Sequence, residues 1–211
     1  MRLILVRSAG TAWHAGAPTE DESRIQGTVP LPLSEEGMAV LRDVAEKVRQ
    51  LGPACLVSSG NESSGTTAAY LADLCGIKAK KLAELRELDC GVWQGLRVGE
   101  IKERFGRAYK QWRQDPTSVR PPQGEALEAA AVRVERALEQ IRKKHKGKTV
   151  VIVAAYIVAG LVECLITGRP LGELWAAAEG AGNIRVLELA DTAPLEGGGR
   201  VIEQIVAKQG G

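Results

Sequence analysis

The residues best suited to chemistry stand directly after apolar runs. Leu3–Val6 is followed by Arg7 and Ser8, a cation beside a hydroxyl. Such runs are typical of buried strands in a parallel sheet, which is covered on both faces. Ligands of open α/β sheets bind just beyond the carboxyl ends of these strands. We therefore expect a site at Arg7 and Ser8, although a first strand and its turn would give the same local pattern.

Strands and helices alternate along the rest of the chain. Apolar runs and turn residues predict strands over 3–6, 54–57, 82–88, 149–154, 184–189 and 201–207, whereas helical periodicity predicts helices over 34–51, 66–74, 98–105, 125–146, 158–167 and 171–178. No repeat or linker interrupts this order. It predicts a single domain over 1–211 with a doubly wound, mostly parallel α/β sheet, helices on both faces and a small helical insertion at about 97–123.

Composition and charge narrow the function classes. The 211 residues include 28 Lys and Arg against 26 Asp and Glu, a net charge of +2 that favours neither nucleic acid nor a membrane surface as a partner. The first apolar run is too short for a secretory signal, and no stretch approaches the about 18 apolar residues of a membrane span. We expect a cytoplasmic protein.

Cysteines and histidines give no pattern for a metal. The four cysteines, among them Cys90, are scattered without a C-x-x-C pair and are expected to be reduced structural thiols. The only histidines, His14 and His145, have no cysteine beside them in the sequence, so a zinc site is not expected. Both are expected on the surface, with a catalytic role for His14 in the long loop 12–32 as the alternative. We expect no cofactor and no metal.

Six segments carry short motifs in a fixed order. They lie at Leu3–Thr11, Arg24–Gly37, Val57–Ala68, Glu84–Leu96, Pro121–Glu125 and Val150–Tyr156. In order and spacing they resemble the histidine phosphatase superfamily, in its phosphoglycerate mutase-like branch. Arg7-Ser8-Ala9-Gly10-Thr11 occupies the place of the family's Arg-His-Gly-Glu-Thr, and Val153-Ala154-Ala155-Tyr156 that of Val-Ser-His-Gly. The resemblance implies a phosphoglycerate mutase-like fold.

The same resemblance implies an altered site. In the family, a first histidine attacks phosphorus, two arginines and a second histidine hold the phosphoryl oxygens, and a glutamate protonates the leaving oxygen. In this chain the nucleophile position is Ser8, the second arginine is Ser63 and the second histidine is Ala155. Arg7 and Glu87 remain. Tyr156 takes the place of the glycine after the second histidine.

These changes predict a pseudophosphatase, in which no residue is catalytic and the pocket binds a ligand or partner. Each lost charge-assisted hydrogen bond to a phosphoryl oxygen removes roughly 1.5–3 kcal/mol. The remaining pocket suits a small polar or weakly anionic ligand. We expect the residues at the positions of the family's motifs to bind it, and we expect Trp93 and Ser64 to line the pocket as well. The expected ligand-binding residues are Arg7, Ser8, Arg24, Ser63, Glu87 and Tyr156.

Two other functions stay open. A divergent phosphomonoesterase, either phosphatase or mutase, would use Ser8 and Glu87 instead of a phosphohistidine. A serine nucleophile needs an adjacent base, and Glu87 is the one candidate. The second open function is that of a purely structural subunit. Such a subunit would form a homodimer through an edge strand or through the inserted helices.

Overall fold

The computed structural model describes residues 1–13, 19–180, 183–189, 195 and 199–205, the last of these by backbone alone. The strands are β1 (Arg2–Arg7), β2 (Cys55–Ser58), β3 (Ala79–Lys81), β4 (Thr149–Ala154), β5 (Ile184–Leu189) and β6 (Gly199–Ile205). The helices are α1 (Glu35–Gln50), α2 (Glu62–Cys75), α3 (Val98–Gln114), α4 (Leu127–Lys144), α5 (Tyr156–Thr167) and α6 (Leu174–Gly180). Short 3₁₀ turns are η1 (Glu20–Glu22), η2 (Ala83–Leu85), η3 (Gly91–Trp93) and η4 (Leu171–Glu173).

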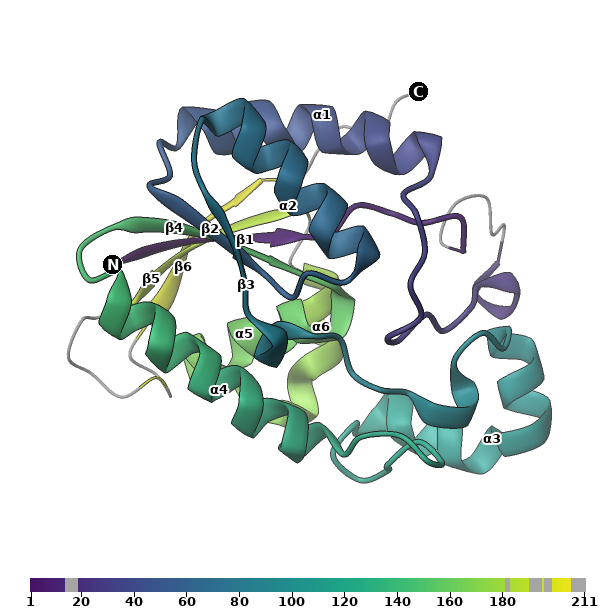
Figure 1. Cartoon of the computed structure of the whole chain (residues 1–211). Coiled ribbons are helices and arrows are strands. Elements are labelled where there is room, and N and C mark those ends of the chain that lie inside the picture. Colours follow the sequence, from purple (N-terminus) through teal and green to yellow (C-terminus); the bar gives the residue numbers. More distant parts are fainter. Residues whose placement is uncertain (14–18, 181–182, 190–194, 196–198, 206–211) are drawn as a thin grey trace.

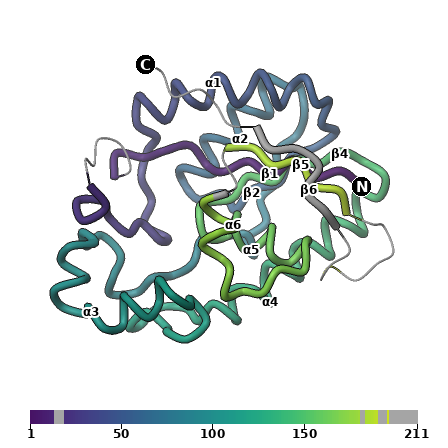
Figure 2. The backbone as a smooth tube through the Cα atoms, turned by 180° about the vertical axis from the view of Figure 1, so that it is seen from behind, coloured from purple at the N-terminus to yellow at the C-terminus, as the bar shows by residue number. Residues whose placement is uncertain are grey.

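A single sheet of order β3-β2-β4-β1-β5-β6 runs through the middle of the fold (Figure 1). β3, β2, β4 and β1 are parallel, whereas β5 runs antiparallel to β1 and β6 antiparallel to β5. The predicted doubly wound, mostly parallel sheet is confirmed. The tube in Figure 2 shows α3 set apart from the sheet, where the helical insertion was expected.

The two faces of the sheet are covered by different helices. In β1, Leu3 and Leu5 pack with the core that contains α4 and α5, while Ile4 and Val6 pack with the core of α1 and α2. Successive side chains of a strand point to opposite faces. A central strand buried on both sides therefore needs an uninterrupted apolar run. This run is why the sequence alone predicts β1 as a strand.

The third strand lies elsewhere than expected. The prediction placed it at 82–88, but β3 is Ala79–Lys81, and the following residues form η2. Every residue of β3 is exposed, and it pairs only with β2. An edge strand packs little apolar surface, and lysines there discourage pairing with other chains. The apolar pattern that marked the central strands is therefore absent from this one.

Helix ends also differ from the expected ones. α2 begins at Glu62 rather than 66, and α5 begins at Tyr156 rather than 158. α3 continues past the expected end at 105 to Gln114, with a kink where Phe105 has φ −132°, and stops before Pro116. Within the described parts of the chain, no helix is both long and apolar enough to cross a membrane.

Candidate functional site

The strand ends of β1 and β4 bring two of the predicted positions together. Arg7 pairs with Ala154 across the parallel ladder, and the backbone N–H of Ser8 donates to the Ala154 carbonyl at 2.8 Å. Ser8 and Ala155 therefore leave the sheet side by side. They open onto a cavity of about 550 Å³ whose lining includes every expected ligand-binding residue: Arg7, Ser8, Arg24, Ser63, Glu87 and Tyr156.

The loop after β1 is fixed by the start of α1. Ser34 caps that helix by accepting from the Gly37 N–H at 3.0 Å, and its own N–H donates to the Gly10 carbonyl at 3.0 Å. A Cβ on Gly37 would lie 2.1 Å from the Gly10 oxygen, so only glycine fits. The Pro-Leu-Ser-Glu-Glu-Gly motif thus positions the backbone beside Ser8.

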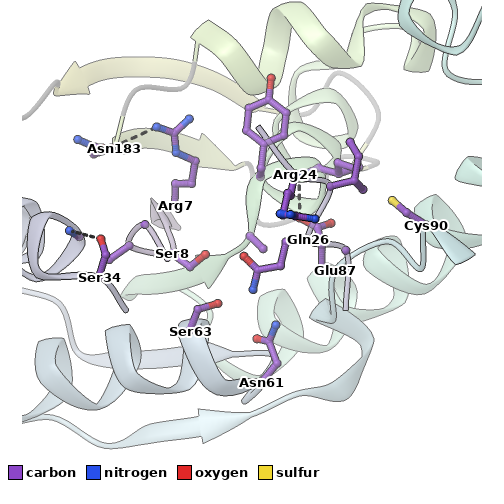
Figure 3. Close-up of a pocket in the computed structure, with 18 of the residues that line it drawn as sticks. Arg7, Ser8, Arg24, Gln26, Ser34, Asn61, Ser63, Glu87, Cys90 and Asn183 are labelled. Atoms are coloured by element: carbon purple, nitrogen blue, oxygen red, sulfur yellow. Dashed lines mark hydrogen bonds between the residues drawn. The ribbon is translucent and has the colours of Figure 1, made fainter. Parts of the chain in front are cut away.

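The start of α2 supplies the hydroxyl and amide groups of the cavity. Figure 3 shows Ser63 and Asn61 facing the same space as Ser8. The Ala9 N–H donates to Thr67 Oγ1 at 3.1 Å, which ties this helix to the β1 loop. Because Ser63 is buried and neutral, this part of the cavity supplies hydrogen bonds but no positive charge.

Glu87 reaches the cavity but is fully engaged by backbone. Its Oε1 accepts from the N–H groups of Leu88 at 2.7 Å and Val158 at 3.2 Å, and its Oε2 from that of Ile157 at 2.9 Å. Ile157 and Val158 belong to the first turn of α5, whose N–H groups lack partners inside the helix. The Glu87 carboxylate therefore caps α5.

The protonation of Glu87 follows from its burial. Removal from water raises the pKa of Glu87 to about 7, against the opposing pull of its three backbone N–H donors and of Arg133. Near neutral pH this carboxyl can therefore hold a proton, which makes the cavity less negative than an ionised Glu87 would.

Arg133 holds the segment that carries Glu87, a role that no sequence motif indicated. Its guanidinium forms a two-point ion pair with Glu125 at 2.8 Å and donates to the backbone carbonyls of Glu84, Arg86 and Glu87. A side chain on α4 thereby fixes a non-helical segment distant in sequence. The sequence feature that could have indicated this role is a cation on the apolar stripe of the predicted helix 125–146.

Of the three arginines that the structure describes in the cavity lining, Arg7 and Arg24 have neutral neighbours. Arg7 donates to Asn183 Oδ1 at 3.4 Å (Figure 3), and its guanidinium lies 5.9 Å from the Tyr156 ring centroid. Burial lowers the pKa of Arg7. Arg24 donates to the Gly95 carbonyl and lies 6.0 Å from the Trp13 ring. Within the described residues, neither forms an ion pair with a carboxylate.

Aromatic rings make up another part of the lining. Tyr109, Trp112 and Trp175 join Tyr156 there, although the motifs gave no sign of the first three. Trp112 and Trp175 meet edge to face with centroids 4.5 Å apart. They come from α3 and α6, so only the packing of these helices brings them to the strand ends.

Two residues expected in the lining are buried away from it. Trp93 is 0% exposed and packs edge to face on Tyr109 and Trp112, with centroids 5.9 and 5.3 Å away. Ser64 is also 0% exposed, one position beyond Ser63 on α2. Adjacent helical residues point in different directions, so only one of the two serines reaches the cavity.

The surface expectation for His145 is wrong, and His14 lies outside the described residues. His145 ends α4 with 7% exposure, and its Nδ1 lies 3.3 Å from Cys55 Sγ. Burial, and then Lys80, Lys148 and Lys144, lower its pKa. Cys90 is a buried free thiol that belongs to the cavity lining, and its purely structural role stays a prediction. Among the described residues, no group of three or more His, Cys, Asp or Glu could hold a metal.

Comparison with known proteins gives matches to a histidine phosphatase family model and to proteins named as phosphatases or phosphoglycerate mutases. A sequence model of the histidine phosphatase superfamily (branch 1) matches residues 3–195. The probable phosphoglycerate mutase GpmB of Enterobacter sp. strain 638 is 32% identical over 173 residues, 81% of this chain and 76% of that protein. Phosphoserine phosphatase 1 of Hydrogenobacter thermophilus is 28% identical over 176 residues, 83% of this chain and 81% of that one.

Solved structures agree on the fold. Bacillus stearothermophilus YhfR superposes with a TM-score of 0.83 at 23% identity, covering 99% of this chain and 98% of that one. A mycobacterial glucosyl-3-phosphoglycerate phosphatase gives 0.81 at 22% identity, covering 98% and 99%. With the family model spanning most of the sequence, these matches show that the chain belongs to the histidine phosphatase superfamily and has phosphoglycerate mutase-like relatives.

Proposed function

We propose that this protein is a histidine phosphatase-fold binding protein without phosphomonoesterase activity, whose cavity takes a small polar or weakly anionic ligand. The observation that carries the proposal is the pair of strand ends at β1 and β4. The family resemblance assigns both catalytic histidines to these ends, where this chain has Ser8 and Ala155. Among the described residues, none that lines the cavity carries an imidazole.

The loss of these groups affects both chemistry and charge. Phosphoryl transfer depends on positioning and on charge stabilisation of three equatorial oxygens. Ser63 and Ala155 offer no charge to those oxygens. Removal of a covalent nucleophile costs on the order of 10⁶ in turnover in a serine hydrolase. Arg7 and Arg24 remain in the lining, so the cavity can still attract an anion, but without the full set of charged donors that phosphoryl transfer uses.

The test is phosphate release, followed by phosphorus NMR. The substrates follow the names of the relatives: phosphoserine, phosphoglycerate, glucosyl-3-phosphoglycerate and α-ribazole phosphate. We expect no release by the native protein above a Glu87→Ala control during one day. Release by the native protein alone would contradict the proposal.

A gain-of-function variant sharpens this test. Ser8→His, Ser63→Arg and Ala155→His, combined with Tyr156→Gly, restore the family residues at the positions of both histidines, the second arginine and the glycine after the second histidine. If the scaffold is intact and only these side chains are missing, the combined variant should release phosphate from at least one substrate of the panel. The matched control carries all changes except Ser8→His and should stay inactive, because it lacks the nucleophile.

One observation favours a second candidate, a divergent phosphomonoesterase. Burial raises the pKa of Glu87 to about 7, where a carboxyl can hold and deliver a proton near neutral pH. Such an enzyme would use Ser8 as nucleophile and Glu87 as acid. Turnover abolished by both Ser8→Ala and Glu87→Gln would establish this candidate, whereas turnover that survived both changes would reject it.

A further inference from the structure

The cavity has two kinds of lining. Ser8, Asn61 and Ser63 give a polar, uncharged part (Figure 3). Tyr156 and Trp175 give a flat apolar part. The volume of about 550 Å³ is within the range of pockets for small organic ligands, roughly 300–1,000 Å³. A purely hydroxyl-rich ligand would leave the aromatic part of this space without a partner.

The aromatic part is held in place before any ligand binds. The Trp175 indole N–H donates to the Trp112 carbonyl at 3.0 Å, so the polar edge of that ring is satisfied. The Tyr156 ring lies 17° from parallel to the Trp175 ring, with centroids 6.4 Å apart. Rings fixed in this way lose little conformational freedom on binding, which favours affinity for a second flat ring.

Two arginines lie close to this ring pair, and they differ in their partners. Arg113 lies 4.9 Å from the Trp175 centroid and forms an ion pair with Glu179 at 3.2 Å. Arg7 lies 5.9 Å from the Tyr156 centroid and donates to the neutral amide of Asn183. Arginine stays charged at neutral pH even when partly buried. Arg7 is therefore the cation whose charge a ligand could still neutralise.

We infer that the cavity binds a planar aromatic ligand with one carboxylate, its ring against Tyr156 and its carboxylate toward Arg7. The inference rests on the proposed binding role and names the ligand class. A single negative charge matches Arg7, which lies beside the Tyr156 ring and has a neutral amide as its hydrogen-bond partner. Ser63, at the place of the family's second arginine, offers a phosphate dianion only a hydroxyl.

The experiment is a titration followed by tryptophan fluorescence, because Trp112 and Trp175 line the cavity. The probe is 2-naphthoate. Its matched controls are 2-naphthamide, which keeps the rings and loses the charge, and cyclohexanecarboxylate, which keeps the charge and loses the planar ring. We expect 2-naphthoate to bind about tenfold more tightly than either control, since each lacks one of the two interactions.

Two pairs of variants test whether 2-naphthoate binds in the cavity. Tyr156→Leu and Arg7→Gln should each weaken 2-naphthoate about tenfold, and Arg7→Gln should abolish the preference over 2-naphthamide. Tyr70→Leu and Arg49→Gln change the same residue types outside the cavity lining and should leave the affinity unchanged. Equal affinity of 2-naphthoate and 2-naphthamide, unchanged binding by Tyr156→Leu, or no saturable binding would each overturn the inference.

The same samples separate this inference from the proposed function. Release of 2-naphthol from 2-naphthyl phosphate would overturn the proposed lack of phosphomonoesterase activity, yet leave the dependence of 2-naphthoate binding on ring and charge intact. Without hydrolysis, failure of 2-naphthoate to bind would overturn only the aromatic ligand class.

Discussion

Glu87 and Glu163 are both buried, at 5% and 1% exposure, but the fold stabilises them differently. Glu163 on α5 receives a two-point ion pair from Arg185 on β5, with contacts of 2.9 and 3.2 Å. From the described part of the chain, the Glu87 carboxylate receives backbone N–H groups alone. The nearby Arg133 donates to the Glu87 carbonyl rather than to its carboxylate.

The different partners of the two carboxyls make one of them part of a structural ion pair and leave the other, Glu87, able to gain or lose a proton. A buried charge is tolerated when an opposite charge and hydrogen bonds replace its water. Glu163 has both, in the core between helix and sheet. Glu87, beside the cavity, has the hydrogen bonds but only a weak pull from Arg133, which does not contact its carboxylate, and its pKa is raised to about 7. It is therefore the member of this pair whose protonation a bound ligand could shift.

Breaking the ion pair should give the largest effect. Glu163→Ala leaves the Arg185 guanidinium buried without its carboxylate, and we expect a loss of about 3–5 kcal/mol in the free energy of unfolding. Chemical denaturation measures it. The double variant Glu163→Met and Arg185→Met should lose much less, because no charge stays buried. A double variant as unstable as the single one would contradict this account.

The pH response of Glu87 should give the next effect. Its folded pKa of about 7 lies above the reference value of 4.5, so the folded state holds a proton that the unfolded state has released. Stability from this group is full below 4.5 and is lost as pH rises to about 7, a change of about 3 kcal/mol. Glu87→Gln should remove that loss.

The measurement is the free energy of unfolding of both proteins between pH 4 and pH 8. The native protein should lose stability relative to Glu87→Gln across this interval. Parallel curves would mean that the three backbone donors outweigh burial and keep Glu87 ionised throughout.

A smaller effect is expected at the residue that positions Glu87. Arg133→Met removes donors to three carbonyls and to Glu125, and should cost about 2–3 kcal/mol. Arg86→Met removes the exposed partner of the same Glu125 and should change stability by at most about 0.5 kcal/mol. Thermal unfolding of both variants tests this, and equal losses would show that Arg133 does not hold the segment.

The parts of the fold that could be predicted are those with local causes. Leu3–Val6 is apolar because both faces of β1 are covered, and Ser34 marks the start of α1 because its side chain caps the helix. β3 was misplaced since an exposed edge strand needs no such pattern. The single domain over 1–211, the homodimer and the cytoplasmic location stay predictions.

The candidate site divides in the same way. The motifs predicted that Arg7, Ser8, Ser63 and Glu87 would meet, and all four line the cavity. Trp93 was assigned to the same lining because it belongs to a motif, but it packs beneath the cavity instead. Motif membership indicates which segments converge, whereas the direction of each side chain depends on local backbone geometry.

The sequence by itself determined the family and most of the order of the elements, because these follow from residue types and their spacing. The tertiary structure decided what surrounds those positions: that Glu87 caps α5, that Arg133 holds its segment, and that Trp112 and Trp175 reach the cavity. These contacts join residues far apart in the chain. Their energies depend on burial and distance, which exist only once the helices have packed on the sheet.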